Sequence, residues 1–150
     1  MKKKFIIVFV IILLLGFGYK YYSDKYTYKG FIKNNGFAYM YKFPEGNDFF
    51  NKGYRNNYIL LSEDHIVISE AKKVPENLRD HYPSSVIKSP LEYPNPKFDK
   101  KTGTLTVDIP PVKGDTEMEK IVIEVLDNGK LKLNDLVYDS CDIKDIDLQS

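Results

Sequence analysis

The chain has few of the residues that most often carry chemistry or covalent cross-links. Cys141 is its one cysteine, so no intramolecular disulfide can form, and there are two histidines and no tryptophan. No Cys-x-x-Cys, His-Glu-x-x-His or paired-histidine spacing occurs, which argues against a zinc site. A Gly-x-Ser-x-Gly elbow and a phosphate-cradling glycine loop are also missing. The sequence therefore predicts no catalytic residue, no metal site and no cofactor, and it favours a protein that is not an enzyme.

An excess of positive charge is missing as well. The 150 residues include 22 basic and 21 acidic side chains, for a net charge of +1. Residues 1–22 contain four lysines and no acid, so residues 23–150 have a net charge of −3. A mildly acidic domain lacks the basic surface that binds phosphate backbones, and we therefore predict no nucleic-acid partner.

One long apolar run is present, from Phe5 to Tyr19, directly after Lys2, Lys3 and Lys4. A helix of 15 residues is about 22 Å long, which is shorter than the roughly 30 Å hydrocarbon core of a bilayer. Interfacial tyrosines and the long side chain of Lys20 extend the segment that a membrane can accept. The run therefore predicts contact with a membrane through residues 5–22.

Two interpretations of this run stay open. An uncleaved anchor needs only apolar length and interfacial aromatic residues, whereas a cleaved signal peptide needs small residues, which Gly16 and Gly18 supply for cleavage after Gly18. Both interpretations export residues 23–150, and the three N-terminal lysines favour a cytoplasmic N-terminus. We predict a single-pass protein of the cell membrane, or alternatively a secreted one, with a cytoplasmic n-region at 1–4, the helix at 5–22 and one extracytoplasmic domain at 23–150.

Alternation of apolar and polar residues predicts that this domain consists mostly of strands. Asn35-Gly36 and Asn128-Gly129 favour tight hairpin turns, because glycine and asparagine accept positive φ values. The expected strands are 26–33, 37–43, 58–62, 65–69, 104–109, 118–126, the region of 131–133 and 136–138.

The prolines determine which secondary structure we predict for the middle of the chain. Pro75 suits a first helical turn, which predicts one short helix over 75–82. Four prolines between residues 83 and 103 predict a long irregular connection rather than a central strand. The predicted fold is mainly β, an antiparallel sheet that forms a sandwich or a partly open barrel with one short helix, with α+β as the alternative.

Several groups of side chains invite a functional interpretation. The alternating aromatic residues of the strand 37–43 suit a binding platform, but a buried sheet face explains them without further assumptions. Cys141 and the histidines lack catalytic partners in sequence, and the acidic tail does not have the spacing of a calcium loop. The segment Ser89–Pro96 suits either a recognition loop or an inert connection. These candidates are Phe37, Tyr39, Tyr41 and Phe43 with Tyr26 and Tyr28; His65 and His81; Cys141; and Asp135, Asp139, Asp142, Asp145 and Asp147.

The leading hypothesis is a membrane-anchored module of the bacterial cell envelope that binds a protein or peptide outside the membrane. One alternative is a small secreted enzyme that uses Glu63 or Asp64 with His65. The other is a structural subunit of the envelope that assembles through a sheet edge.

Overall fold

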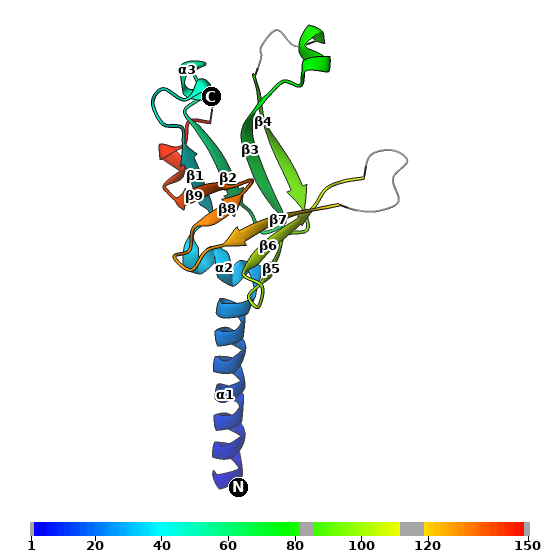
Figure 1. Cartoon of the computed structure of the whole chain (residues 1–150). Coiled ribbons are helices and arrows are strands. Elements are labelled where there is room, and N and C mark those ends of the chain that lie inside the picture. Colours follow the sequence, from blue (N-terminus) through cyan, green and yellow to red (C-terminus); the bar gives the residue numbers. More distant parts are fainter. Residues whose placement is uncertain (1, 82–85, 112–118, 149–150) are drawn as a thin grey trace.

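The structure, a computed structural model, describes residues 2–81, 86–111 and 119–148 and consists of a long N-terminal helix joined to a β domain (Figure 1). Helix α1 (Lys2–Tyr26) has 25 residues, and its side chains from Ile6 to Tyr22 are exposed. Among the described residues it is the one helix long and apolar enough to cross a membrane, over Ile6–Tyr26. The predicted N-terminal apolar helix is therefore confirmed.

The prediction of a strand over 26–33 is wrong, because this segment forms helix α2 (Tyr28–Asn35). The hydroxyl oxygen of Thr27 accepts a hydrogen bond from the amide of Gly30 at 3.0 Å, which is the geometry of a helix N-cap. At the other end, Gly36 has a φ of 91° and its amide donates to the carbonyl of Ile32. Asn35-Gly36 thus ends a helix instead of turning a hairpin.

Helix α2 crosses the end of α1 at very short distance. The Cα of Gly30 lies against the backbone of Ser23 and Asp24, where a Cβ atom would overlap with the main chain. Lys33 Nζ pairs with Asp24 Oδ2 at 2.9 Å, and Asn34 Nδ2 donates to the Asp24 carbonyl at 2.5 Å. The last turn of α1 is therefore part of the folded domain.

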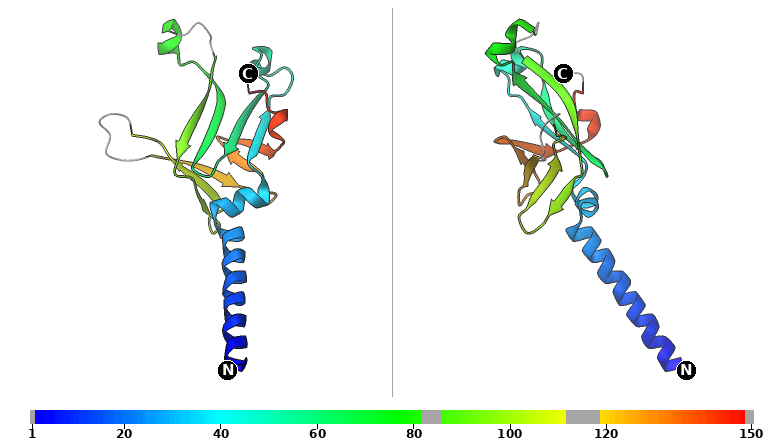
Figure 2. Two further views of the ribbon diagram at one scale, coloured as in Figure 1. Left: turned by 180° about the vertical axis from the view of Figure 1, so that it is seen from behind. Right: turned by 90° about the vertical axis from the view of Figure 1, so that its right-hand side faces the viewer.

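The domain is built on one curled antiparallel sheet of nine strands that forms a half-barrel (Figure 2). The strand order is β4-β3-β2-β1-β9-β8-β7-β6-β5. The strands are β1 (Ala38–Lys42), β2 (Asn56–Leu61), β3 (His65–Lys73), β4 (Val86–Pro94), β5 (Lys97–Asp99), β6 (Thr104–Asp108), β7 (Lys120–Val125), β8 (Leu131–Leu133) and β9 (Leu136–Ser140).

Every neighbouring pair in this sheet is also consecutive in sequence except one. Strand β1 pairs with β9, so that Tyr39 lies opposite Ser140 and Met40 opposite Asp139. The barrel stays open between β4 and β5, which are the two edges of the sheet. The mainly antiparallel β fold predicted from sequence is confirmed, and of its two forms the partly open barrel describes the sheet.

Most strand predictions agree with the structure, with small differences in length. Strands β1, β2, β6, β7, β8 and β9 fall on the expected segments, and β3 continues to Lys73. The residues 127–129 turn the chain between β7 and β8, where Gly129 has a φ of 78°. Asn134 and Asp135, both at positive φ, turn it again before β9. Met118 lies outside the described residues.

The prediction of an irregular connection over 83–103 is wrong, because β4 and β5 occupy most of it. Strand β4 is an edge strand, and an edge is where a sheet tolerates proline. The short helix predicted at 75–82 is present as a single 3₁₀ helix, η1 (Glu76–His81), at the tip of the β3–β4 ribbon (Figure 1). Residues 82–85, where the predicted helix ends and the predicted connection begins, lie outside the described residues.

The apolar core fills the inside of the curl. It joins buried residues from opposite walls of the half-barrel, and Phe31 of α2 packs against it from one end. On the outer face, a second cluster forms where Ile146, beside the 3₁₀ helix η2 (Ile143–Asp145), covers Met40 and Tyr58. A third cluster centres on Phe43 and includes Phe49 beside it in helix α3 (Asp48–Asn51). Fully buried core residues are Tyr39, Ile59, Ile66, Leu105, Val107, Ile123, Leu131 and Tyr138.

Candidate functional site

A hollow of about 260 Å³ lies on the inner face of the β3–β4 ribbon, and we call it the ribbon groove. The register places Ile68 opposite Leu91 and Glu70 opposite Ser89. Because side chains alternate between the faces of a strand, these four lie on the same side of the ribbon. The groove is lined by Ile68, Glu70, Lys72, Lys73, Pro75, Ile87, Ser89, Leu91 and Tyr93.

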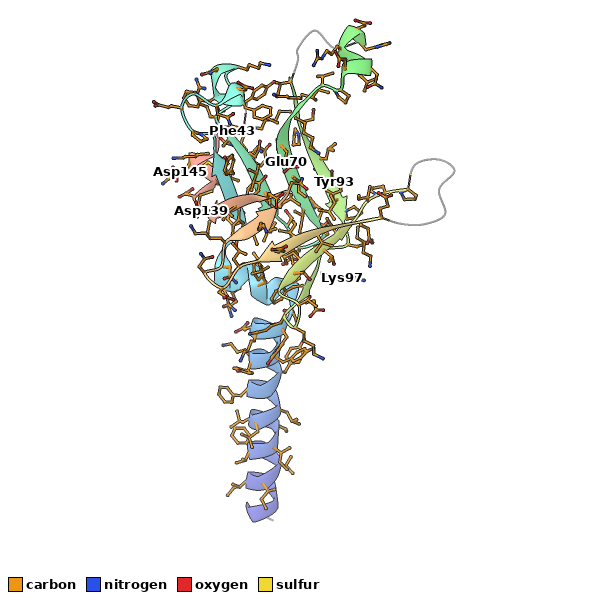
Figure 3. All side chains as sticks on the ribbon, viewed as in Figure 1. Phe43, Glu70, Tyr93, Lys97, Asp139 and Asp145 are labelled. Atoms are coloured by element: carbon orange, nitrogen blue, oxygen red, sulfur yellow. The ribbon has the colours of Figure 1, made fainter. Side chains whose placement is uncertain are left out.

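Glu70 is the shielded carboxylate of this groove (Figure 3). Its side chain is only 8% exposed. Tyr138 Oη donates to its Oε1 at 3.1 Å, and Asn134 Nδ2 donates to its Oε2 at 3.1 Å. Lys72 Nζ lies 3.7 Å from Oε2. These contacts tie β3 to β9 and to the β8–β9 turn across the inside of the half-barrel, and they satisfy a charge that would be costly to bury alone.

The tyrosines around Glu70 remain neutral hydrogen-bond donors. Burial raises the pKa of Tyr138, and the negative charge of Glu70 raises it further. Tyr93 also has a raised pKa, first because of burial and then because of the same carboxylate. Glu70 therefore carries the negative charge of the groove lining, which also includes Lys72 and Lys73. Lys72 lies beside the carboxylate with a side chain that is 70% exposed, and Lys73 pairs with Asp48 Oδ2 at 3.4 Å.

The rim of the groove is apolar and open to solvent. Leu91 is 55% exposed, and Ile87 and Tyr93 are half-buried. An apolar rim around one fixed carboxylate suits a ligand with both an apolar and a cationic group. The segment Ser89–Pro96, which the sequence marked as a recognition loop or an inert connection, supplies three residues of this lining.

The free edge of β4 is poorly suited to pairing with another strand. The amide of Ser62 donates a hydrogen bond to the carbonyl of His65, so the backbone groups of odd-numbered β3 residues face β2 and form hydrogen bonds with it. Because these groups alternate in direction along a strand, those of even-numbered β3 residues form hydrogen bonds with β4. In the β3–β4 register, even-numbered β3 residues lie opposite odd-numbered β4 residues. The backbone N–H and C=O groups of even-numbered β4 residues therefore face away from the sheet. Pro90 and Pro94 are at two of these positions and have no amide to donate. The prolines keep this edge of the barrel unpaired.

The alternating aromatic residues of β1 belong mainly to the core, as the simpler interpretation predicted. Tyr39 is fully buried, Phe43 is 6% exposed and Tyr41 is half-buried, while Phe37 is 47% exposed just before the strand. Burial raises the pKa of Tyr39 to about 12. The two tyrosines expected nearby are not in the sheet: Tyr28 begins α2 and Tyr26 ends α1.

Glu63, Asp64 and His65 lie at the β2–β3 turn. His65 Nδ1 is 2.6 Å from Asp64 Oδ1, and this hydrogen bond lowers the pKa of Asp64. Glu63 pairs with Lys29 Nζ at 3.1 Å. Glu63 and Asp64 border a hollow of about 410 Å³ together with Asp108, but His65 does not line it. The structure therefore does not bring the three side chains to one cavity, and His81 lies apart from them in η1.

Cys141 is half-buried on the outer face of the sheet, beside the second apolar cluster. Burial raises the pKa of its thiol, and the nearby Asp145, Asp142 and Asp139 raise it further. A raised pKa leaves less thiolate at neutral pH, which opposes a role as nucleophile.

Two carboxylates of the acidic tail make contacts with residues near them in the structure. Asp139 pairs with Lys130 Nζ at 2.7 Å, and Asp142 Oδ1 accepts from the amide of Lys144 at the start of η2. No group of three His, Cys, Asp or Glu side chains within residues 2–81, 86–111 and 119–148 is arranged to hold a metal ion.

Glu70 is the site residue that the sequence-based reasoning missed. The strand was expected to end at Ser69, so the alternation of Ile66, Ile68 and Glu70 on one face was not followed to its third member. A scan of this chain against protein-family models, curated proteins and solved structures found no match.

Proposed function

We propose that the protein is a membrane-anchored, extracytoplasmic binding module of the cell envelope. Helix α1 holds the chain in the membrane with its N-terminus in the cytoplasm. The ribbon groove binds an extended segment of a protein partner that presents an apolar side chain next to a lysine or arginine. The net charge of −3 over residues 23–150 supports a protein partner rather than a nucleic acid.

The observation that carries the proposal is the shielded carboxylate of Glu70 beside the apolar side chains of Ile87 and Leu91. Its two hydrogen-bond donors, Tyr138 and Asn134, fix the position of the carboxylate. A cationic side chain of the partner would take up a charge-assisted hydrogen bond there, in competition with the solvent-exposed Lys72. Leu91 and Ile87 would bury their exposed surface against the apolar side chain beside it.

The place of the groove supports the same function. The β3–β4 ribbon points away from the membrane-spanning part of α1 (Figure 1). A partner could therefore reach the groove without contacting the lipid. The distance between anchor and groove is bridged by folded structure, because α1 continues into the domain through its contacts with α2.

Binding through side chains agrees better with the sheet than assembly through its edges. Pro90 and Pro94 remove two outward amides from β4, and the opposite edge strand, β5, has only three residues. This argues against the alternative of a subunit that polymerises by strand pairing.

Peptide binding tests the proposal. The full-length chain in detergent micelles is titrated with labelled extended peptides that are identical except for a central Arg, Gln or Glu between leucines, and fluorescence anisotropy is measured. We expect the Arg peptide to bind at least tenfold more tightly than the Glu peptide. Glu70→Gln should remove this preference and Leu91→Ser should weaken all binding, whereas Val122→Ser, on the exposed face of β7, should change neither. Equal affinity for the three peptides would refute the proposed site.

Protease treatment of intact cells tests the location. We expect added protease to degrade residues 23–150 in intact cells and to leave a membrane-bound fragment that contains α1. A domain that is degraded only after lysis would contradict the extracytoplasmic placement. Release of the whole chain into the medium would favour the secreted form instead.

A further inference from the structure

We propose that the base of the domain docks on the phosphate headgroups of an anionic lipid bilayer. The docking surface, which we call the basic collar, consists of Lys25, Lys97, Lys100, Lys101, Tyr22 and Tyr26. This inference rests on the proposed insertion of α1 into the membrane, and it adds a second contact between the domain and the lipid.

The depth of the collar follows from the length of α1. The apolar run Phe5–Tyr19 is centred on Ile12. At about 1.5 Å per residue, Tyr22 lies about 15 Å from that centre along the helix, and Tyr26 about 21 Å. The hydrocarbon core extends about 15 Å from the bilayer midplane, and the headgroup region ends at roughly 20–22 Å. Tyr22 and Tyr26 therefore bracket the headgroup layer.

The β5–β6 turn lies beside this part of α1 (Figure 1). Lys100 Nζ lies 5.1 Å from the ring centroid of Tyr26, and the rings of Tyr22 and Tyr26 stack with centroids 5.3 Å apart. The contact keeps the ammonium group of Lys100 beside the ring of Tyr26, next to the headgroup layer. A folded part of the domain, remote in sequence from the helix, thus reaches the headgroup layer.

The local structure holds the turn in place. Asp99 Oδ1 accepts hydrogen bonds from the amides of Lys101 and Thr102, at 2.8 and 3.3 Å. Gly103 has a φ of 63°, which completes the turn into β6. The side chains of Lys100 and Lys101 are exposed at its tip.

A hollow of about 510 Å³ separates the turn from α1. It is lined by three aromatic residues, three lysines, two threonines and one acid, which are Tyr22, Tyr26, Phe98, Lys97, Lys100, Lys101, Thr104, Thr106 and Asp99. Ammonium and hydroxyl groups are donors that phosphate oxygens accept, and aromatic rings are favoured at the membrane interface. The hollow offers the donors and the apolar walls that a lipid headgroup uses.

The sign of the charge here is opposite to that of the domain as a whole. Of the acids near the collar, Asp24 pairs with Lys33 at 2.9 Å and Asp99 is bound to the amides of its own turn. Asp127 lines a hollow with Lys25 and Lys100, and Lys97 borders another hollow with Glu63, Asp64 and Asp108. Lys25 Nζ contacts Tyr21 Oη at 2.6 Å rather than an acid. At the tip of the turn Lys100 and Lys101, together with Lys25, outnumber Asp99 and Asp127, which leaves a net positive patch on a domain whose net charge is −3. Such a patch gains from anionic lipid in particular.

The test uses the full chain in lipid nanodiscs. A fluorophore is attached to Thr102→Cys in a Cys141→Ser background, and the discs contain a lipid with a nitroxide headgroup that quenches it. Discs of phosphatidylcholine alone are compared with discs that also contain phosphatidylglycerol. We expect stronger quenching with phosphatidylglycerol and a return to the phosphatidylcholine value in high salt.

The charge variants decide the outcome. Each lysine near an anionic surface is worth about fivefold in occupancy, so Lys100→Gln with Lys101→Gln should lower the ratio of docked to undocked domains about 25-fold. The matched pair Lys72→Gln and Lys73→Gln, at the other end of the domain, should leave quenching unchanged. Equal quenching in both kinds of disc overturns the collar while the anchor stands. Loss of the chain from the discs on gel filtration overturns the anchor itself.

Discussion

Helix α1 exposes its apolar side chains, whereas the β domain buries most of its own. Leu13 of α1 is 44% exposed and Leu105 of β6 is fully buried. In α1 the apolar residues surround the whole helix, whereas in the sheet they alternate with polar ones and occupy one face. A helix that is apolar on all sides needs an apolar phase supplied from outside, while the sheet creates its own by curling. The two regions therefore differ in whether the folded chain itself covers their apolar side chains.

Charges placed within α1 should have the largest effect. Ile12→Arg with Leu13→Arg costs about 2.5–3.5 kcal/mol per arginine at the centre of a membrane helix. We expect the chain to disappear from the membrane fraction after carbonate extraction and flotation. Leu13→Ile is the matched control and should remain in the membrane. A double-arginine variant that stays in the membrane would show that α1 does not cross it.

Truncation of a core leucine should have the next largest effect, and only in the sheet. Leu105→Ala should lower the free energy of unfolding by about 2–5 kcal/mol, because it leaves a cavity in the fully packed interior. Leu13→Ala, the same change in α1, should leave the unfolding of the domain unaffected. The measurement is urea denaturation of the full chain in micelles, followed by tyrosine fluorescence. An equal loss of unfolding free energy in both variants would show that α1 is packed into the domain as the sheet residues are.

Alkaline pH should have the smallest effect, through the buried tyrosines. Tyr39 has a pKa of about 12 in the folded chain, against about 10 in an unfolded one. Because the folded state holds this proton more tightly, its stabilising contribution is complete below pH 10 and is lost as the pH rises towards 12. The unfolding midpoint in urea should fall over this window, and the fall should be smaller in Tyr39→Phe. An identical pH dependence in both proteins would show that Tyr39 does not cause the loss of stability.

The sequence predicted the sheet well where alternation and turn chemistry agreed. Asn128-Gly129 lies between two alternating segments, and the β7–β8 hairpin forms there. Asn35-Gly36 has the same dipeptide but ends a helix, because Thr27 provides an N-cap and Gly30 allows a close crossing with α1. That crossing is a tertiary contact, and a local sequence pattern does not predict it.

The candidate site was less accessible to prediction than the fold. The prolines of β4 were correctly read as incompatible with a central strand, but not as marks of an edge strand. The partners of Glu70 are Tyr138 and Asn134, more than sixty residues away in the chain. Such a network depends on the curl of the sheet, which single-strand patterns do not specify. His65, in contrast, was easy to notice because its partner Asp64 is its neighbour in sequence.

The pairing of β1 with β9 has a consequence for how the chain folds. All other strand pairs join consecutive strands and can form as soon as each hairpin is synthesised. Tyr39 must wait for Ser140, roughly 100 residues later, and closure of so long a loop is slow. Because β1 precedes β9 in the chain, the N-terminal strands would emerge with one edge of β1 unpaired. The domain would thus remain vulnerable to proteolysis and to misassembly until its last strand arrives.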